Sequence, residues 1–121
     1  MLGGTGAISN TVLGQVKTAV GSAVPVTRLG GTNRFDTAAK VSKAAVTTAT
    51  EVFLANGLSY PDALAGSAVA PYFGGRPLLL TMKDCVPSQT LAEITRLGAT
   101  KVTALGGTGV VSDAALSLKP C

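Results

Sequence analysis

Short apolar runs alternate along the chain with segments in which apolar residues recur every three or four positions. This pattern predicts strands that alternate with helices. The run Leu78-Leu79-Leu80 has no polar residue between its members, as expected of a strand that is buried on both faces of a parallel sheet. Four strands are expected from such runs, over residues 24–29, 51–56, 77–81 and 101–105.

Helices are predicted between these strands. Two pairs of residues have the spacing of a capping box, in which polar side chains bond the first backbone amides of a helix: Asn33 with Asp36, and Ser59 with Asp62. The first pair precedes a helix over 37–46, and the second precedes a helix of small side chains over 63–70, which is expected to approach the sheet closely. The last helix, residues 88–97, has one apolar stripe and ends before Gly98.

The order of these elements predicts an α/β fold, an open parallel sheet with helices on both faces and right-handed crossovers. A chain of 121 residues is long enough for one domain, and with 46% apolar residues it is too apolar to be disordered. Because no apolar run approaches the roughly 18 residues that cross a bilayer, we expect no membrane span. A signal peptide is not expected within this sequence, since no segment has the basic and then apolar layout.

One segment of the sequence occurs twice. Leu-Gly-Gly-Thr-Gly-Ala-Ile-Ser-Asn, from residue 2, returns as Leu-Gly-Gly-Thr-Gly-Val-Val-Ser-Asp from residue 105. The two copies start at residues 2 and 105 of a chain of 121 residues, so the chain contains one full period and the end of another. This indicates that the sequence is a segment of a tandem array of repeats. We therefore expect residues 1–22 to be the end of a preceding unit and residues 23–121 to be one complete unit. The apolar stripe that follows the first copy would then lack the unit it packs against: Val12, Leu13, Val16 and Val20.

Composition excludes several chemistries. The chain has no histidine, which rules out Ser-His-Asp and Cys-His nucleophile systems and zinc sites of the HExxH type. Two cysteines are too few for a four-ligand zinc site. We therefore predict no metal site and no cofactor. The net charge of +4 suits an anionic partner, but scattered basic residues and few aromatic ones argue against nucleic acid.

The two cysteines, Cys85 and Cys121, have 35 residues between them. This arrangement is compatible with a disulfide that holds the end of the chain. It is equally compatible with two unrelated reduced thiols, and the spacing alone leaves both interpretations open.

Six polar or basic residues lie at or just past the carboxyl ends of the expected strands: Arg28, Arg34, Asn56, Ser59, Tyr60 and Lys83. In an open parallel sheet this edge is where ligands bind, and arginine can hold a phosphate or carboxylate group with two hydrogen bonds. These six residues are therefore the candidate ligand contacts. The alternative is that the two arginines pair with Asp36 or Asp62 and hold the loops in place. Those two carboxylates are themselves expected to cap helices.

The tetrapeptide Leu-Gly-Gly-Thr occurs at residues 2–5, 29–32 and 105–108. Its glycines allow a tight turn between a strand and a helix, and also allow backbone amides to reach an anion. Residues 107–112 nearly match the dinucleotide-binding fingerprint, but serine replaces the third glycine and too few residues follow for the expected acidic one. A small Rossmann-like enzyme domain that binds a nucleotide or phosphometabolite is therefore the second hypothesis for function.

Four motifs, in order and spacing, resemble the type 2 cell-wall-binding repeat of Gram-positive bacteria. Arg-Leu-Gly-Gly-Thr-Asn-Arg-Phe-Asp-Thr-Ala at residues 28–38 resembles its opening. Ala-Asn-Gly at 55–57 and Pro-Asp-Ala-Leu at 61–64 resemble its central signature. Pro-Leu-Leu-Leu at 77–80 resembles its strand of proline and aliphatic residues, and Leu-Gly-Gly-Thr at 105–108 its closing strand and turn. The resemblance covers about residues 24–118.

The resemblance implies a Rossmann-like or toprim-like fold of three layers and a non-enzymatic, extracellular function. Members of this family anchor surface proteins to the wall without a covalent bond, and their ligand is taken to be an anionic secondary wall polymer of the teichoic-acid type. Their repeats usually come three in a row about a pseudo-threefold axis. Because this chain holds one complete repeat, we expect it to form a homotrimer. An exported location favours a Cys85–Cys121 disulfide.

Overall fold

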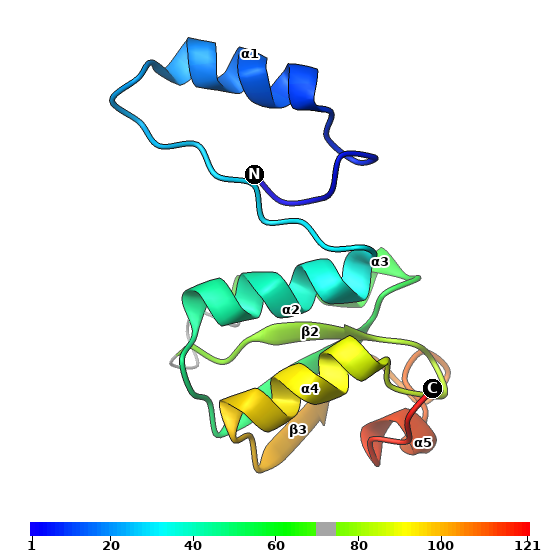
Figure 1. Cartoon of the computed structure of the whole chain (residues 1–121). Coiled ribbons are helices and arrows are strands. Elements are labelled where there is room, and N and C mark those ends of the chain that lie inside the picture. Colours follow the sequence, from blue (N-terminus) through cyan, green and yellow to red (C-terminus); the bar gives the residue numbers. More distant parts are fainter. Residues whose placement is uncertain (70–74) are drawn as a thin grey trace.

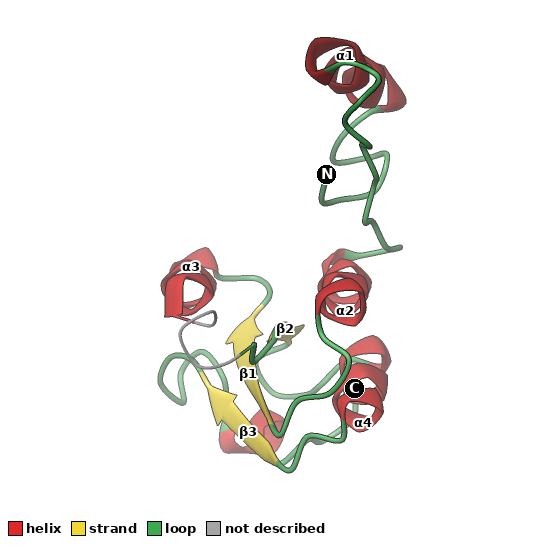
Figure 2. Cartoon of the chain, turned by 90° about the vertical axis from the view of Figure 1, so that its left-hand side faces the viewer, coloured by secondary structure: helices red, strands yellow, loops and turns green. Residues whose placement is uncertain are grey.

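The computed structural model describes residues 1–69 and 75–121, and it has the mixed α/β architecture expected from the sequence (Figure 1). Three parallel strands, β1 (Glu51–Asn56), β2 (Leu78–Thr81) and β3 (Lys101–Ala104), form a sheet in the order β2-β1-β3. The helices are α1 (Asn10–Val20), α2 (Arg34–Ala45), α3 (Tyr60–Val69), α4 (Ser88–Leu97) and α5 (Asp113–Leu116). Figure 2 shows α3 on one side of the sheet, with α2 and α4 on the other.

The core lies mainly between the sheet and α4. All six residues of β1 are buried, because β1 is the central strand. Its Val52 and Leu54, both fully buried, belong to one cluster with Leu79 of β2 and with Ile94 and Leu97 of α4. The apolar stripe expected along one side of the helix over residues 88–97 is therefore confirmed as the face of α4 that covers the sheet.

The prediction that residues 78–80 are buried on both faces of the sheet is wrong. Leu79 is fully buried, but Leu78 and Leu80 are only half-buried. The physical reason is that β2 is an edge strand, so part of each outward-facing side chain meets a cleft rather than packed protein. The strand that is buried throughout is β1.

The strand expected over residues 24–29 does not join the sheet. Within this segment only Leu29 pairs, in an isolated parallel bridge with Leu2. Residues 1–30 instead form a separate lobe, hereafter the N-terminal lobe, which lies apart from the unit of residues 34–121, hereafter the main unit (Figure 1). Helix α1 of this lobe has no buried residue, and 42% of Val12 and of Val20 is exposed. The apolar stripe on α1 therefore remains largely uncovered in this chain.

Helix α2 begins at Arg34, three residues earlier than expected, because Asn33 caps it. The Asn33 side-chain oxygen accepts a hydrogen bond from the Asp36 backbone N–H at 2.9 Å. The Asp36 carboxylate in turn accepts from the backbone N–H of Thr32 at 2.8 Å and from Lys40 at 3.0 Å. The hydrogen bond from Thr32, followed by that from Lys40, holds the pKa of Asp36 below its ordinary value. The expected capping role of Asp36 is thus confirmed.

Helix α3 lies close to the sheet, as its small residues predicted. Gly66 is buried, and a Cβ atom at this position would collide with the side chain of Leu105, just after β3. The opposite face of α3 is open, since 67% of Tyr60 and 70% of Leu64 is exposed. Residue 70, where the predicted helix ends, lies outside the described residues.

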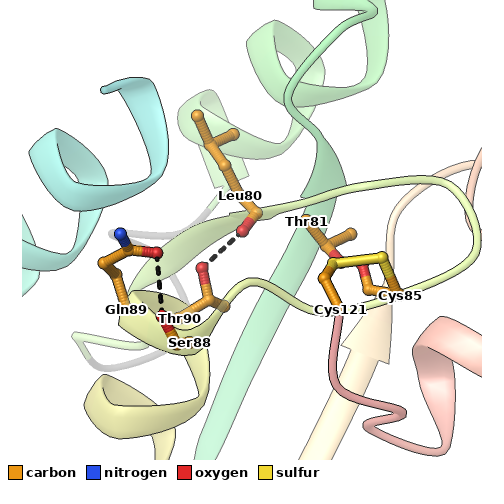
Figure 3. Close-up of a disulfide and its surroundings, with 7 residues drawn as sticks. All are labelled: Leu80, Thr81, Cys85, Ser88, Gln89, Thr90 and Cys121. Carbon is orange, nitrogen blue, oxygen red and sulfur yellow. Dashed lines mark hydrogen bonds between the residues drawn. A yellow bond between two sulfur atoms is a disulfide. The ribbon is translucent and has the colours of Figure 1, made fainter. Parts of the chain in front are cut away.

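The predicted disulfide is present (Figure 3). Cys85, in the loop after β2, bonds Cys121, and the chain leading to Cys121 forms a parallel bridge with the segment after Cys85. In this bridge Val86 donates its N–H to the carbonyl of Lys119 at 2.7 Å and accepts from the N–H of Cys121 at 3.1 Å. The disulfide and the backbone hydrogen bonds together fix the C-terminal segment to the main unit.

Candidate functional site

The three strands end at one edge of the sheet, and the loops that follow them hold most of the predicted ligand contacts. β1 ends at Asn56, β2 at Thr81 and β3 at Ala104. Because the strands are parallel, the loops after them gather at this edge, which is where open α/β sheets bind ligands. The region comprising these loops and the starts of α2 and α3 is called the carboxyl edge below.

Asn56 connects two of these loops. Its side-chain oxygen accepts a hydrogen bond from the N–H of Leu58 at 2.8 Å, and its amide nitrogen donates to the carbonyl of Val110 at 2.7 Å. Only 8% of Asn56 is exposed. An amide is well suited to this position because it donates and accepts at once. Asn56 thus holds the loop after β1 against the loop after β3.

Arg34 connects α2 to the same loop. Its guanidinium donates a hydrogen bond to the carbonyl of Gly57 at 2.6 Å. At Gly57 the chain is so close to α2 that a Cβ atom would lie 2.7 Å from the ring of Phe35. The alternative expectation was that the arginines hold the loops by pairing with Asp36 or Asp62. Arg34 does hold a loop, but it does so through the carbonyl of Gly57 and not through either carboxylate.

The side chains that the carboxyl edge presents to solvent include Tyr60 and Lys83. Tyr60 is the first residue of α3, and Ser59 before it is half-buried. Lys83, in the loop after β2, is exposed, while its carbonyl accepts a hydrogen bond from the N–H of Ser112 at 2.9 Å. The backbone at Lys83 is therefore fixed and its ammonium group is free to extend into solvent.

Arg28 is not part of the carboxyl edge. Its guanidinium donates hydrogen bonds to the carbonyl of Gly3 at 3.0 Å, to the carbonyl of Ser9 at 3.2 Å and to the side-chain oxygen of Asn10 at 3.4 Å. All of these partners belong to the N-terminal lobe. The sequence could not show this, because the assignment of Arg28 to the edge rested on a strand at 24–29 in the same sheet.

A cleft of about 1120 Å³ lies between the N-terminal lobe, α2 and the edge formed by β2. Its lining consists mostly of glycine, threonine and aliphatic residues, among them Gly31, Val41 and Leu78. The two charged residues in the lining, Arg34 and Arg76, are both basic. Sequence reasoning missed this cleft, since it forms between segments whose relative placement depends on the separate N-terminal lobe.

A cluster of charges lies at the opposite, amino-terminal end of the sheet. The buried carboxylate of Glu51 accepts hydrogen bonds from Thr103 at 2.5 Å and from Lys101 at 2.9 Å, and it pairs with Arg76 at 2.7 Å. The bond from Thr103, followed by the others, holds the pKa of Glu51 below its ordinary value. Sequence analysis did not single out this cluster, although the carboxylate of Glu51 directly before the apolar run of residues 52–55 was the available signal.

The glycine-rich segment that resembles a dinucleotide-binding fingerprint forms a tight turn. The carbonyl of Gly107 accepts hydrogen bonds from the N–H groups of Val110 at 2.9 Å and Val111 at 3.1 Å. The turn leads into α5, which has only four residues. Among the described residues, no group of three or more Cys, Asp or Glu side chains is placed to hold a metal ion, and no helix is both long and apolar enough to cross a membrane.

These observations define a small parallel α/β domain whose loops meet at one edge. A family model described as cell wall binding domain 2 matches residues 28–116, which is most of the chain. The chain belongs to the cell wall binding domain 2 family. The resemblance drawn from the four sequence motifs is thereby confirmed, and the domain is a binding module by family.

Relatives with known structures or curated names agree with this assignment. N-acetylmuramoyl-L-alanine amidase LytC of Bacillus subtilis (strain 168) is 37% identical over 122 residues, which cover 99% of this chain and 23% of the amidase. Cwp6 from Clostridium difficile superimposes with a TM-score of 0.73 at 35% identity, over 77% of this chain and 15% of Cwp6. Cwp8 from the same organism gives a TM-score of 0.73 at 25% identity, over 92% of this chain and 18% of Cwp8. This chain thus spans less than a quarter of each relative.

Proposed function

We propose that this domain anchors a secreted protein to the wall of a Gram-positive bacterium by binding an anionic secondary wall polymer of the teichoic-acid type. Membership of the cell wall binding domain 2 family is the observation that carries this proposal. The domain would act outside the cell and would bind without catalysing a reaction. The net charge of +4 supports an anionic ligand, since it raises the local concentration of anions at the surface.

The contacts we propose are the exposed polar groups of the carboxyl edge. Lys83 supplies a charge and Tyr60 a ring with a polar tip, while Arg34, Asn56 and Ser59 shape the loops around them. A polymer repeats its anionic group along its length, so weak contacts on several domains at once can give strong retention. Arg28 would contribute only where the polymer extends to the N-terminal lobe.

The proposal predicts that retention on purified cell walls depends on the anionic polymer and on salt. The domain should sediment with native walls and remain in solution with walls from which the polymer has been extracted. Raising the salt concentration to about 1 M shortens the screening length from about 8 Å to about 3 Å, so most of the bound protein should be released. Equal retention on extracted walls, or at high salt, would contradict the proposal.

A matched pair of variants tests whether the carboxyl edge makes the contact. Lys83→Glu should weaken wall binding by roughly fivefold, as expected for the loss of one exposed charge contact worth about 1 kcal/mol. Lys17→Glu changes the net charge equally on the exposed surface of α1 and should have a smaller effect. Equal losses in both variants would show that net charge, and not this edge, determines binding. Arg34→Ala is less suitable, because it also frees the carbonyl of Gly57.

We further propose that the chain forms a homotrimer, as its single complete repeat implies for a family whose repeats pack in threes. The uncovered stripe on α1 supports this proposal, because a neighbouring copy could pack against Val12 and Val20. A head-to-tail contact with threefold rotation closes on itself. Light scattering at about 50 µM protein should therefore give about 36 kDa, three times the 12.0 kDa of one chain. A stable species of one chain at that concentration would contradict the trimer.

A further inference from the structure

The two copies of the repeated segment have the same backbone structure. In the N-terminal lobe, the carbonyl of Gly4 accepts hydrogen bonds from the N–H groups of Ala7 and Ile8, both at 3.0 Å. In the main unit, the equivalent carbonyl of Gly107 accepts from Val110 and Val111. The glycine before each turn has a positive φ, 123° at Gly3 and 100° at Gly106. Residues 1–10 and 104–113 are therefore structural as well as sequence equivalents.

In the N-terminal lobe, this segment is paired with a strand. The N–H of Leu29 donates to the carbonyl of Met1 at 2.8 Å, and the N–H of Gly3 donates to the carbonyl of Leu29 at 2.8 Å. The amino group of Met1 donates to the carbonyl of Thr27 at 2.7 Å. At Gly30 the two backbones approach so closely that a Cβ atom would lie 2.5 Å from the carbonyl oxygen of Gly3. The segment 27–30, here called the docking strand, is thus shaped to fit this partner.

In the main unit, the equivalent backbone groups point to an open edge. Lys101 and Leu105 direct their N–H groups to β1, bonding the carbonyls of Thr50 at 3.0 Å and Leu54 at 2.8 Å. Successive residues of a strand alternate in direction, so Ala104, the last residue of β3, directs its N–H and C=O groups to the outer side of the strand. Gly106, two residues further on, has a positive φ like its equivalent Gly3, whose N–H bonds the docking strand. Among the described residues, no strand pairs with that side. Ala104 and Gly106 are the equivalents of Met1 and Gly3, which bind the docking strand.

The side chains around this edge also match the docking strand. Arg28 in the N-terminal lobe donates to Gly3, Ser9 and Asn10, whose equivalents are Gly106, Ser112 and Asp113. The amide oxygen of Asn10 is therefore replaced by a carboxylate, which gives an arginine a stronger, charge-assisted hydrogen bond.

We propose that the outer edge of β3, with the turn from Leu105 to Asp113, binds the docking strand of a second copy of this chain. Leu29 of the second copy would accept a hydrogen bond from the N–H of Gly106 and donate to the carbonyl of Ala104. Arg28 of the second copy would pair with Asp113. The sheet then gains a fourth parallel strand, which is the strand that the sequence places first in the unit but that the main unit lacks.

The contact is head-to-tail and competes with pairing inside one chain. A docking strand binds either its own Met1–Gly3 segment, as in this structure, or the β3 edge of a neighbour. The internal partner has the advantage of proximity, whereas the neighbour offers the carboxylate of Asp113. The proposal depends neither on the wall polymer nor on the number of copies at which the assembly closes, so its test is separate from those of the proposed function.

The test is a disulfide cross-link between two full-length variants, Leu29→Cys and Leu105→Cys, which replace the residues expected to lie side by side. Mixed under mild oxidation, they should give about tenfold more covalent dimer than Leu29→Cys mixed with Thr95→Cys, because only cysteines held within disulfide range trap each other. Thr95 is exposed on α4, away from β3. Adding Gly3→Pro to the Leu29→Cys chain should raise the yield, since proline lacks the N–H that holds Leu29 internally. Equal yields with Leu105→Cys and Thr95→Cys would overturn the proposal.

Exchanging the charges of Arg28 and Asp113 distinguishes a lost contact from a variant that fails to fold. Asp113→Arg in the Leu105→Cys chain should lower the yield several-fold, because it places two cations together. Arg28→Glu in the Leu29→Cys chain should then restore it. Asp113 is exposed, so its replacement is not expected to disturb the core. A yield that neither falls with the first change nor recovers with the second would show that Arg28 and Asp113 do not meet, and would also overturn the proposal.

Discussion

Replacing both Cys85 and Cys121 by serine should lower the free energy of unfolding by about 3 to 4 kcal/mol. The disulfide closes a loop with a sequence separation of 36, and in the chain-entropy model a loop of that size stabilises the folded state by about this amount. For a domain of this size the loss corresponds to a fall in melting temperature of roughly 10 °C. Urea unfolding followed by circular dichroism measures the free energy of unfolding, and thermal unfolding followed by the same signal measures the melting temperature.

The matched control is reduction of the unchanged protein. Dithiothreitol should lower its stability to that of the double serine variant and should leave the variant unaffected. A thiol titration of the oxidised protein under denaturing conditions should detect no free cysteine. Two titratable thiols, or a serine variant as stable as the oxidised protein, would contradict a stabilising disulfide.

Removing the buried carboxylate of Glu93 should lower the free energy of unfolding by about as much as removing the disulfide. Glu93, on α4, accepts hydrogen bonds from Ser42 of α2 at 2.6 Å and from Arg96 at 2.7 Å, and only 5% of it is exposed. Arg96 also donates to the carbonyls of Val46 and Thr47 at the end of α2. Glu93→Ala leaves these donors without their acceptor and should lower the free energy of unfolding by about 3 kcal/mol. This value is at the lower end of the range for a broken buried ion pair, because the Arg96 side chain reaches solvent.

The same carboxylate should make stability depend on pH. Burial would raise the pKa of Glu93, but the hydrogen bonds from Arg96 and Ser42 outweigh it and hold the pKa below the ordinary 4.5. A carboxylate with a lowered pKa stabilises the fold fully above its unfolded pKa and loses this contribution as pH falls through the folded value. The difference in stability between the unchanged protein and Glu93→Gln should therefore be large at neutral pH and shrink below about pH 4.5. A difference that is constant with pH would contradict this role.

The sequence predicted the main unit well because its elements follow local rules. Residues 88–97 carry one apolar stripe and end before Gly98, and α4 has those bounds. Gly66 lies in a run of small residues, and α3 approaches the sheet at that point. The family resemblance rested on four such local motifs, and the family match confirms it.

The predictions that were wrong concern contacts between distant parts of the chain. An apolar run such as residues 24–29 is compatible with a strand, but its composition does not specify the sheet it joins, and here Leu29 pairs with Leu2. The same limit applies to Arg28, which was placed at the wrong edge as a consequence. Glu51 was missed because its three partners come from two other segments, and only the fold brings Arg76 and Lys101 to the same carboxylate.

The Cys85–Cys121 bond also determines how the domain would respond to mechanical load. A pull on the C-terminal end is transmitted through Cys121 to Cys85, in the loop after β2, instead of along the intervening backbone. Helix α4, strand β3 and helix α5 all lie within this covalent loop. Under tension the loop cannot be extended while the bond is intact, so only the part of the chain before Cys85 can lengthen. In a protein tethered to a wall in flowing liquid, an oxidised domain would therefore give a shorter and stiffer tether than a reduced one.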